Sequence, residues 1–383
     1  MTVHIELHIL QNFAPSCLNR DDTNTPKDCT FGGVRRARLS SQSLKRAIRT
    51  SPVFREGVDS DIGTRTRLLA KELVRRLVER GRSEDAAMEL SILALTAAGY
   101  KMDGARSAVL LFLSPGELGR YADLVDKHWD ALVAVPAAEE PDPAAEKPKK
   151  GAKAKKDAGP KIPKELETAL KALGSDKSES ADIALFGRMI AESTNMNIVA
   201  ACQVAHAIST HEVRPEADFF TAVDDLQPRD ETGAGMMGTV EFNSACYYRY
   251  ASVDVEQLST TLSGDREQAK RVALAFLRAA IVARPSAKQA SMAAHNPPSY
   301  VLVRVRDHGA PCALTNAFVR PIRVGRDEDL AEASMKALEH YDTQLTSMYG
   351  AAGLQFSAST STFAQPESGS VEDLLGKVEK ALV

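Results

Sequence analysis

The sequence of 383 residues lacks several features that would place a protein in a class at once. It has no apolar run of about 18 residues, which excludes a membrane-spanning helix. Its N-terminal residues carry no basic stretch followed by an apolar one, so we expect no secretory signal. The five cysteines are widely spaced and include no CxxC pair. A disulfide framework or a structural zinc site is therefore not expected, and a reducing cytoplasm is the expected compartment.

An excess of charge of one sign is also missing. The chain has 48 Lys and Arg against 51 Asp and Glu, so its net charge is only -3. Nucleic-acid binding would therefore need local basic patches. The sequence contains no GxSxG motif, P-loop or dinucleotide fingerprint. His206 and His211 lie five positions apart, which does not match HExxH, and we expect no metal site there.

The composition that is present, 44% hydrophobic and 26% charged, is typical of a globular protein with a sizeable core. Alternation over residues 3–9 predicts a half-buried strand, followed by a polar loop over 12–33. Further elements are expected as helices over 38–49, 265–283 and 327–349 and as strands over 240–253, 300–306 and 313–324. This order favours an α+β fold, an antiparallel sheet with helices on one face. A ferredoxin-like or RRM-like core is one solution among several.

One segment differs from the rest in composition. Residues 136–163 consist almost wholly of Ala, Pro, Glu, Asp, Lys and Gly, acidic at first and then rich in lysine. Such a segment cannot bury a core, which predicts a disordered loop. A solvated insertion is the favoured interpretation, and a lysine tail that contacts nucleic acid is the alternative.

The most informative charge pattern lies between residues 29 and 55, which hold seven basic residues and no acidic one. A helix here would be capped by Ser40 or Ser41, with Leu44 and Ile48 on its buried face. Free amides and hydroxyls at its N-terminus, followed by the cations of Lys45, Arg46 and Arg49, form a plausible phosphate site. A solvated basic face is the alternative.

Two other stretches could carry chemistry. Asp21 and Asp22 follow the first strand and could bind a metal, act as acid and base, or simply form a turn. Phe219 and Phe220 lie in a polar stretch, where they could stack on bases. Because adjacent side chains of a strand point to opposite faces, one of them would ordinarily be core.

Taken together, the motifs resemble the Cas-seven family, whose type I-E members, known as CasC, form the backbone of the CRISPR surveillance complex Cascade. The matching stretches run through nearly the whole chain in family order: PSCLNRDD (15–22), FGG (31–33), RRARLSSQSLKRA (35–47), ALFGRM (184–189), QVAHA (203–207), DFFTAVDDL (218–226), GAG (233–235), KQ (288–289) and AAHNP (293–297).

The resemblance implies a hand-shaped protein with a modified RRM-like palm, helical fingers and an extended thumb hairpin. The palm would comprise residues 1–63, 186–209 and 244–383. The fingers would be an insertion over 64–185 that contains the 136–163 loop, and the thumb would span 210–243.

The resemblance also implies site residues. Arg20, Lys27, Lys45 and Arg49 would contact guide RNA, with Ser40 and Gln42 beside them. Phe219, Phe220 and Thr221 of the thumb would flip a base of the guide out at regular intervals, with Met189 of the fingers as partner. The resemblance therefore places both phenylalanines at the base, whereas the strand pattern alone favours one of them as a core residue.

The function implied is a non-catalytic scaffold with no cofactor and no metal. Its partners would be crRNA, target DNA that pairs with the guide, and about six copies of itself. The other Cascade subunits would be the large subunit, the small subunit, the 5'-handle cap subunit and the endonuclease that processes crRNA at its 3' hairpin. The alternative is an RNA-guided ribonuclease that uses Asp21 or Asp22, as type III backbone subunits use an aspartate. The sequence does not distinguish immunity from transposition.

Overall fold

The computed structural model describes residues 3–58, 61–135, 162–173, 177–190, 196–226, 235–351, 353–363 and 369–382. The chain divides into two compact units. The first contains residues 1–59, 201–259 and 265–383, and the second contains residues 60–200 and 260–264. Each unit has its own core, and they are described in turn.

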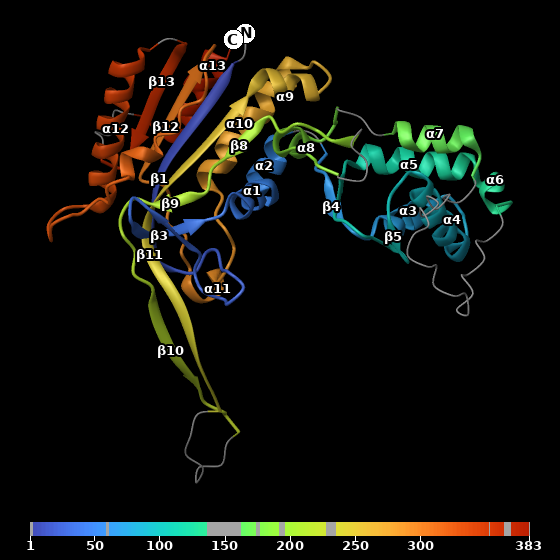
Figure 1. The fold of residues 1–383 in the computed structure, drawn as a ribbon, viewed down its shortest axis with the longest axis horizontal. Coiled ribbons are helices and arrows are strands. Elements are labelled where there is room, and N and C mark those ends of the chain that lie inside the picture. Colours follow the sequence, from blue (N-terminus) through green and yellow to red (C-terminus); the bar gives the residue numbers. More distant parts are fainter. Residues whose placement is uncertain are drawn as a thin grey trace, which may run out of the picture. The chain divides into compact units, whose positions relative to one another are not determined.

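The first unit is built on one large sheet (Figure 1). Its strand order is β13-β12-β1-β11-β9-β3-β2, and β8 and β10 also pair with β11. All pairings are antiparallel, which confirms the predicted α+β class. The strands are β1 (His4–Ser16), β2 (Asp28–Phe31), β3 (Val34–Leu39), β8 (Cys202–Val204), β9 (Ala207–Ser209), β10 (Glu216–Ala222), β11 (Met236–Asp254), β12 (Tyr300–Arg306) and β13 (Leu354–Ser361).

The centre of this sheet follows a split βαβ order. The helix α1 (Ser41–Thr50) lies in the chain between β1 and β8, and α10 (Arg266–Val282) lies between β11 and β12. In the sheet, β1 lies between β12 and β11, and β8 and β9 lie on the far side of β11. This is the order of the ferredoxin-like βαββαβ unit.

Strand β1 is buried on both faces, so the prediction of a half-buried strand was wrong. Leu7 and Ile9 face α1 and α10, where they meet Leu44 and Ala280. On the opposite face, Leu10 joins an apolar cluster under α12 (Leu330–Tyr349) and the 3-10 helix η2 (Thr315–Phe318). Helices therefore cover both faces of the sheet, where one had been expected.

Glu6 and His8 of β1 are both 0% exposed, and each has a hydrogen-bond partner. His8 hydrogen-bonds through Nδ1 to the hydroxyl of Tyr248 at 2.8 Å. The Glu6 carboxylate accepts hydrogen bonds from the Cys312 amide at 2.6 Å and from Arg306 Nε at 3.2 Å. Burial lowers the pKa of His8 and favours its neutral form. Alternation predicted the two faces correctly but not what covers the polar one.

Two loop and strand assignments were also wrong. The expected loop over 12–33 contains the end of β1 and half of the β2–β3 hairpin. The expected strand over 313–324 is η2 followed by an irregular segment, because Leu314 and Phe318 are buried side by side under α12. The described part of the first unit also contains the helices α2 (Pro52–Gly57), α11 (Gln289–Met292) and α13 (Val371–Ala381), and most of α9 (Val255–Thr261).

The second unit is mainly helical. Its elements are β4 (Thr64–Thr66), α3 (Leu69–Val78), α4 (Glu84–Ala97), β5 (Met102–Asp103), β6 (Arg106–Ser107), β7 (Leu111–Leu113), α5 (Pro115–Lys127), α6 (Trp129–Val133), α7 (Lys164–Ala172) and α8 (Ala181–Phe186). Helices α3, α4, α5 and α7 enclose a separate apolar core.

A buried ion pair stabilises the second unit. Arg188 donates from Nη1 to both carboxylate oxygens of Glu117, at 2.8 and 2.9 Å. Glu117 also closes the capping box of α5 by accepting from the Ser114 amide at 2.7 Å. The two side chains are 1% and 3% exposed, so the pair is enclosed.

The lysine-rich loop predicted over 136–163 lies outside the described residues, except for Ile162 and Pro163. Ile162 is buried in the core of the second unit, so the structured part resumes slightly earlier than expected. Among the helices of the described ranges, none combines the length and apolar character needed to cross a bilayer.

Candidate nucleic-acid interface

Helix α1 is built as the sequence predicts. Ser40 is its N-cap, and the Ser40 hydroxyl accepts a hydrogen bond from the Ser43 amide at 3.3 Å. Leu44 and Ile48 form the buried stripe, and the first turn holds no acidic residue. The free backbone amides at the N-terminus of this helix therefore add to the positive electrostatic field of Lys45, Arg46 and Arg49.

A single asparagine brings the preceding loop to the start of α1. Asn19 accepts from the Ser40 amide through its side chain at 2.8 Å and from the Lys27 amide through its carbonyl at 2.8 Å. Arg20 pairs with Pro26 in a β-bridge, which closes the loop. The basic residues Arg20 and Lys27 are thereby joined to the N-terminus of α1, although the chain runs through β2 and β3 in between.

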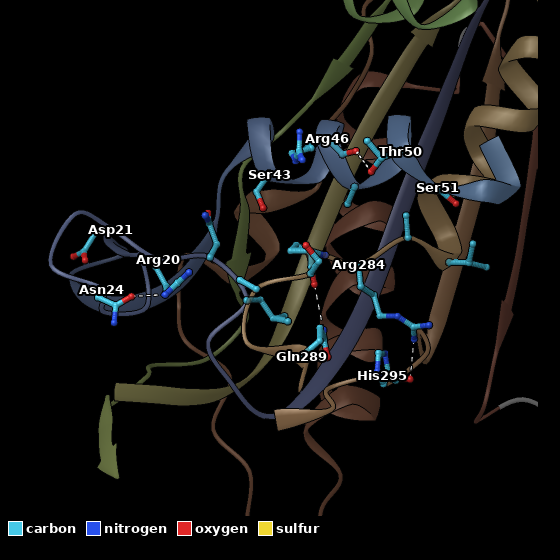
Figure 2. Close-up of a pocket in the computed structure, with 18 of the residues that line it drawn as sticks. Arg20, Asp21, Asn24, Ser43, Arg46, Thr50, Ser51, Arg284, Gln289 and His295 are labelled. Atoms are coloured by element: carbon cyan, nitrogen blue, oxygen red, sulfur yellow. Dashed lines mark hydrogen bonds between the residues drawn. The ribbon is translucent and has the colours of Figure 1, made fainter. Parts of the chain in front are cut away.

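The basic residues of α1 fall on two faces. At about 100° per residue, Gln42, Lys45 and Arg49 lie together on one side of the helix. Ser43, Arg46 and Thr50 lie on the adjoining side and line a cavity (Figure 2). The basic residues of α1 thus occupy two adjoining faces, and Arg46 lies on the face that lines the cavity. We refer to Arg20, Lys27, Lys45, Arg46 and Arg49 together as the basic surface.

Arg38 and His206 form a second pair of basic side chains, beside β9. Arg38 Nη1 is 3.1 Å from His206 Nδ1, and since arginine can only donate, the imidazole nitrogen accepts. Burial and the charges of Arg38 and Lys27 lower the pKa of His206. His211 is engaged elsewhere, because its Nε2 accepts from the Cys246 amide at 3.3 Å. Among the described residues, no cluster of three or more metal-binding side chains occurs.

Arg36, counted in the basic segment, has a structural role. Its side chain is fully buried, and its guanidinium donates to the carbonyls of Phe31, Ser209 and Phe318 at 3.2, 3.1 and 2.7 Å. Burial lowers its pKa. Arg36 therefore joins the β2–β3 turn, β9 and η2, and it is not part of the basic surface.

Asp21 is engaged in a turn. Its carboxylate accepts from the amides and hydroxyls of Thr23 and Thr25, at 2.8 to 3.0 Å. These hydrogen bonds lower the pKa of Asp21 to about 2. The neighbouring Asp22 is exposed at the edge of the cavity. The turn interpretation therefore accounts for Asp21.

The two phenylalanines lie on a hairpin that leaves the sheet, formed by β10 and the first part of β11 (Figure 1). Phe219 is 63% exposed, and Phe220 is half-buried. Phe220 pairs with Gly238 across the hairpin, and a Cβ on Gly238 would lie 2.7 Å from Phe220 Cζ. One face of the Phe220 ring thus rests on glycine backbone, and the neighbouring Thr221 is exposed.

Met189 of the second unit is 85% exposed. An apolar side chain with this exposure is available for contact with a ligand or partner. Its action together with the hairpin stays a prediction.

The cavity beside α1 has a volume of about 910 Å³. Its walls come from the 18–24 loop, from α1 and from the segment after α10, which supplies Arg284, Gln289 and His295 (Figure 2). Arg284 donates from Nη1 to the His295 carbonyl at 2.7 Å. Sequence reasoning missed Arg284 as a lining residue, because only the fold brings the segment after α10 to the same cavity as the 18–24 loop and α1.

Comparison with known proteins agrees with this architecture. The family model of the CT1975-like protein matches residues 5–379. The chain belongs to this family of Cas proteins. No curated protein matches it in sequence.

Solved structures extend the family relationship to the fold. One chain of a "CRISPR RNA-guided surveillance complex, pre-nicking" is 28% identical, with a TM-score of 0.83 over 99% of this chain and 100% of that chain. A chain of a "CRISPR RNA-guided surveillance complex" is 24% identical, with a TM-score of 0.72 and 99% coverage of both. The second likeness concerns the fold alone. The family match and the first of these structures support a backbone of the Cas-seven kind.

Proposed function

We propose that this chain is the guide-RNA-binding backbone subunit of a type I-E CRISPR surveillance complex, Cascade. The observation that carries the proposal is the basic surface around α1, in a chain whose net charge is -3. Asn19 joins the Arg20 and Lys27 loop to the cap of the helix that bears Lys45 and Arg49. Similarity to a chain of an RNA-guided complex over its full length supports the same function.

On this proposal the protein holds the sugar–phosphate backbone of the guide. Lys27, Lys45 and Arg49 would contact phosphates, and Ser40 and Gln42 would donate from the helix N-terminus. Such contacts carry no sequence information, so specificity would come from pairing between guide and target DNA.

The test is the salt dependence of RNA binding. For single strands, the slope of log K against log salt becomes shallower by about 0.7 for each phosphate that the protein no longer neutralises. We expect Lys45→Ala with Arg49→Ala to reduce the slope by about 1.4 and to weaken binding equally for unrelated RNA sequences. Arg278→Ala is the matched control, since Arg278 is paired with Glu372 in α13. A changed sequence preference with unchanged affinity would contradict the phosphate role.

We further propose the palm, fingers and thumb division, with the β10–β11 hairpin as thumb. The thumb of one copy would reach the next copy along the guide, and Phe219, Phe220 and Thr221 would hold a base out of the stack. Met189 of the fingers would contact the same base. The 63% exposure of Phe219 and the position of the half-buried Phe220 ring against Gly238, both on this hairpin, support the assignment.

We propose that the chain is not an enzyme. A general base needs a pKa near the working pH, and the Asp21 pKa of about 2 makes it a weak base. The competing function, a ribonuclease that uses Asp21 or Asp22, predicts cleavage of complementary RNA by the assembled complex with Mg²⁺. We expect intact RNA, and cleavage abolished by Asp22→Ala would establish the competing function.

The proposed partners are crRNA, target DNA, further copies of this chain and the other Cascade subunits, in the cytoplasm. Co-expression with a CRISPR transcript tests this, because the subunit should purify as an RNA-bound filament. Recovery of RNA-free monomer alone would contradict it.

A further inference from the structure

Five buried polar atoms between the sheet and α12 form no hydrogen bond with any group of the described residues. They are Glu6 Oε2 and His8 Nε2 of β1, Tyr250 Oη of β11, Arg304 Nε of β12 and Asp342 Oδ1 of α12. The described ranges contain ten such atoms, so half of them gather at this one place. We call these five side chains the α12 polar cluster. Buried polar atoms without partners are uncommon in native proteins, and ordered water or a bound ion is one explanation for them.

The register of the sheet places the strand residues of the cluster side by side. His8 lies directly opposite Tyr250 in β11, and Glu6 lies directly opposite Arg304 in β12. Opposite residues of antiparallel strands share a face of the sheet. The rings of His8 and Tyr250 have centroids 5.1 Å apart, and Asp342 forms an ion pair with Arg304 from α12. The five side chains therefore belong to one buried polar region.

One gap within the cluster has a defined width. His8 Nε2 and Glu6 Oε2 are 3.9 Å apart, which is too far for a direct hydrogen bond. The hydroxyl oxygen of Tyr248 accepts from the Leu314 amide at 2.9 Å, which favours donation of the hydroxyl proton to His8 Nδ1. The imidazole hydrogen then lies on Nε2. A donor of His8 and an acceptor of Glu6 are thus both open to a third group that lies within reach of each.

The charges of the cluster and its surroundings favour a neutral ligand. Two carboxylates, Glu6 and Asp342, are paired with two guanidinium groups, Arg306 and Arg304. Burial lowers the pKa of His8, so the imidazole is neutral. An added anion would meet the carboxylates, and an added cation would meet the guanidinium groups. The five open atoms include both donors and acceptors, and water satisfies such a mixture because it donates and accepts hydrogen bonds.

We propose that ordered water molecules occupy the α12 polar cluster and that one of them bridges His8 Nε2 and Glu6 Oε2. Two hydrogen bonds of about 2.8 Å that meet at an angle on a water oxygen span the 3.9 Å between these atoms. Glu6 also accepts from the Cys312 amide, and His8 is joined through Tyr248 to the Leu314 amide. The bridging water therefore links the two side chains that hold the segment before η2. This site is independent of any guide RNA.

A high-resolution crystal structure of the full-length chain tests the site directly. We expect a water oxygen within hydrogen-bond distance, about 2.7–3.2 Å, of both His8 Nε2 and Glu6 Oε2. A direct hydrogen bond between these two atoms, with no water beside them, would overturn the proposal.

Oxygen-17 relaxation dispersion of the solvent tests the site in solution, because it counts the water molecules that remain bound to the protein for long times. His8→Phe removes the donor and keeps a planar ring, and it should lose at least one long-lived water molecule. Tyr121→Phe is the matched control. The buried hydroxyl of Tyr121 is 3.0 Å from the Tyr100 hydroxyl, so its removal should leave the number of long-lived water molecules unchanged.

Tyr250→Phe gives a second readout, in stability. A hydroxyl that is hydrogen-bonded to water stabilises the fold, so the unfolding equilibrium constant should rise about fivefold in this variant. A hydroxyl buried without any partner destabilises the fold, and its removal would leave the constant unchanged or lower it. The proposal is overturned if His8→Phe and the unaltered chain hold equal numbers of long-lived water molecules, or if Tyr250→Phe unfolds no more readily than the unaltered chain. If His8→Phe does not fold, the water count of Tyr250→Phe decides, with the same loss expected.

Discussion

Truncation of Phe220 to alanine tests whether its side chain belongs to the hairpin or to the core. Phe220 lies on β10, which pairs with β11, and it contacts Gly238 across the hairpin. Removing one such cross-strand interaction costs about 0.2–1 kcal/mol. Phe276 of α10 is 0% exposed, and its truncation should cost about 3–5 kcal/mol. Phe220→Ala should therefore leave the free energy of unfolding nearly unchanged, whereas Phe276→Ala should lower it strongly.

The same substitution should have a much larger effect on guide binding than on stability. If Phe220 stacks on a base, the interaction contributes about 1–3 kcal/mol, or roughly 5- to 150-fold in affinity for each site. Phe220→Ala should impair assembly on RNA by this amount. Urea unfolding of the isolated subunit and RNA binding are the two assays.

A second variant tests the position of the ring. In Gly238→Val, the new side chain would displace the Phe220 ring, because a Cβ at position 238 would lie only 2.7 Å from Phe220 Cζ and 2.9 Å from Cε1. RNA assembly should fall although Phe220 is present. The reasoning is refuted if Phe220→Ala unfolds as easily as Phe276→Ala and still assembles on RNA as the unaltered chain does.

Three further predictions concern stability. Arg188→Met should cost the second unit about 3–5 kcal/mol in urea unfolding, because Glu117 would remain buried and unpaired. The turn held by Asp21 should be intact above about pH 4 and should open as the pH falls toward its pKa of about 2, as followed by the Thr23 and Thr25 amides in NMR; Asp21→Asn should remove this transition. Because the pKa of buried His8 is lowered, the unfolded chain binds the proton first, so unfolding free energy should fall below about pH 6.5 by up to about 1.4 kcal/mol per pH unit. His8→Gln should show a shallower slope, and an equal slope would exclude His8 as its source.

Local sequence determined the elements whose patterns are complete within a few residues. The Ser40 cap, the Leu44 and Ile48 stripe and the end of α1 before Pro52 all follow from short-range hydrogen bonding and helical spacing. The long strand β11 and helix α10 were likewise predicted within a few residues of their bounds. The basic character of α1 was also readable, since charge does not depend on folding.

Tertiary structure alone decided what covers each surface. Period-two alternation sorted β1 into two faces, but only the packing of α12 shows that Glu6 and His8 are buried. Likewise, Arg36 and Arg46 are both arginines of one basic segment, and long-range pairing puts the first among backbone carbonyls and the second beside a cavity. Arg284 lines that cavity because only the fold brings the segment after α10 there. Burial and such convergence depend on the whole chain, so no short stretch of sequence specifies them.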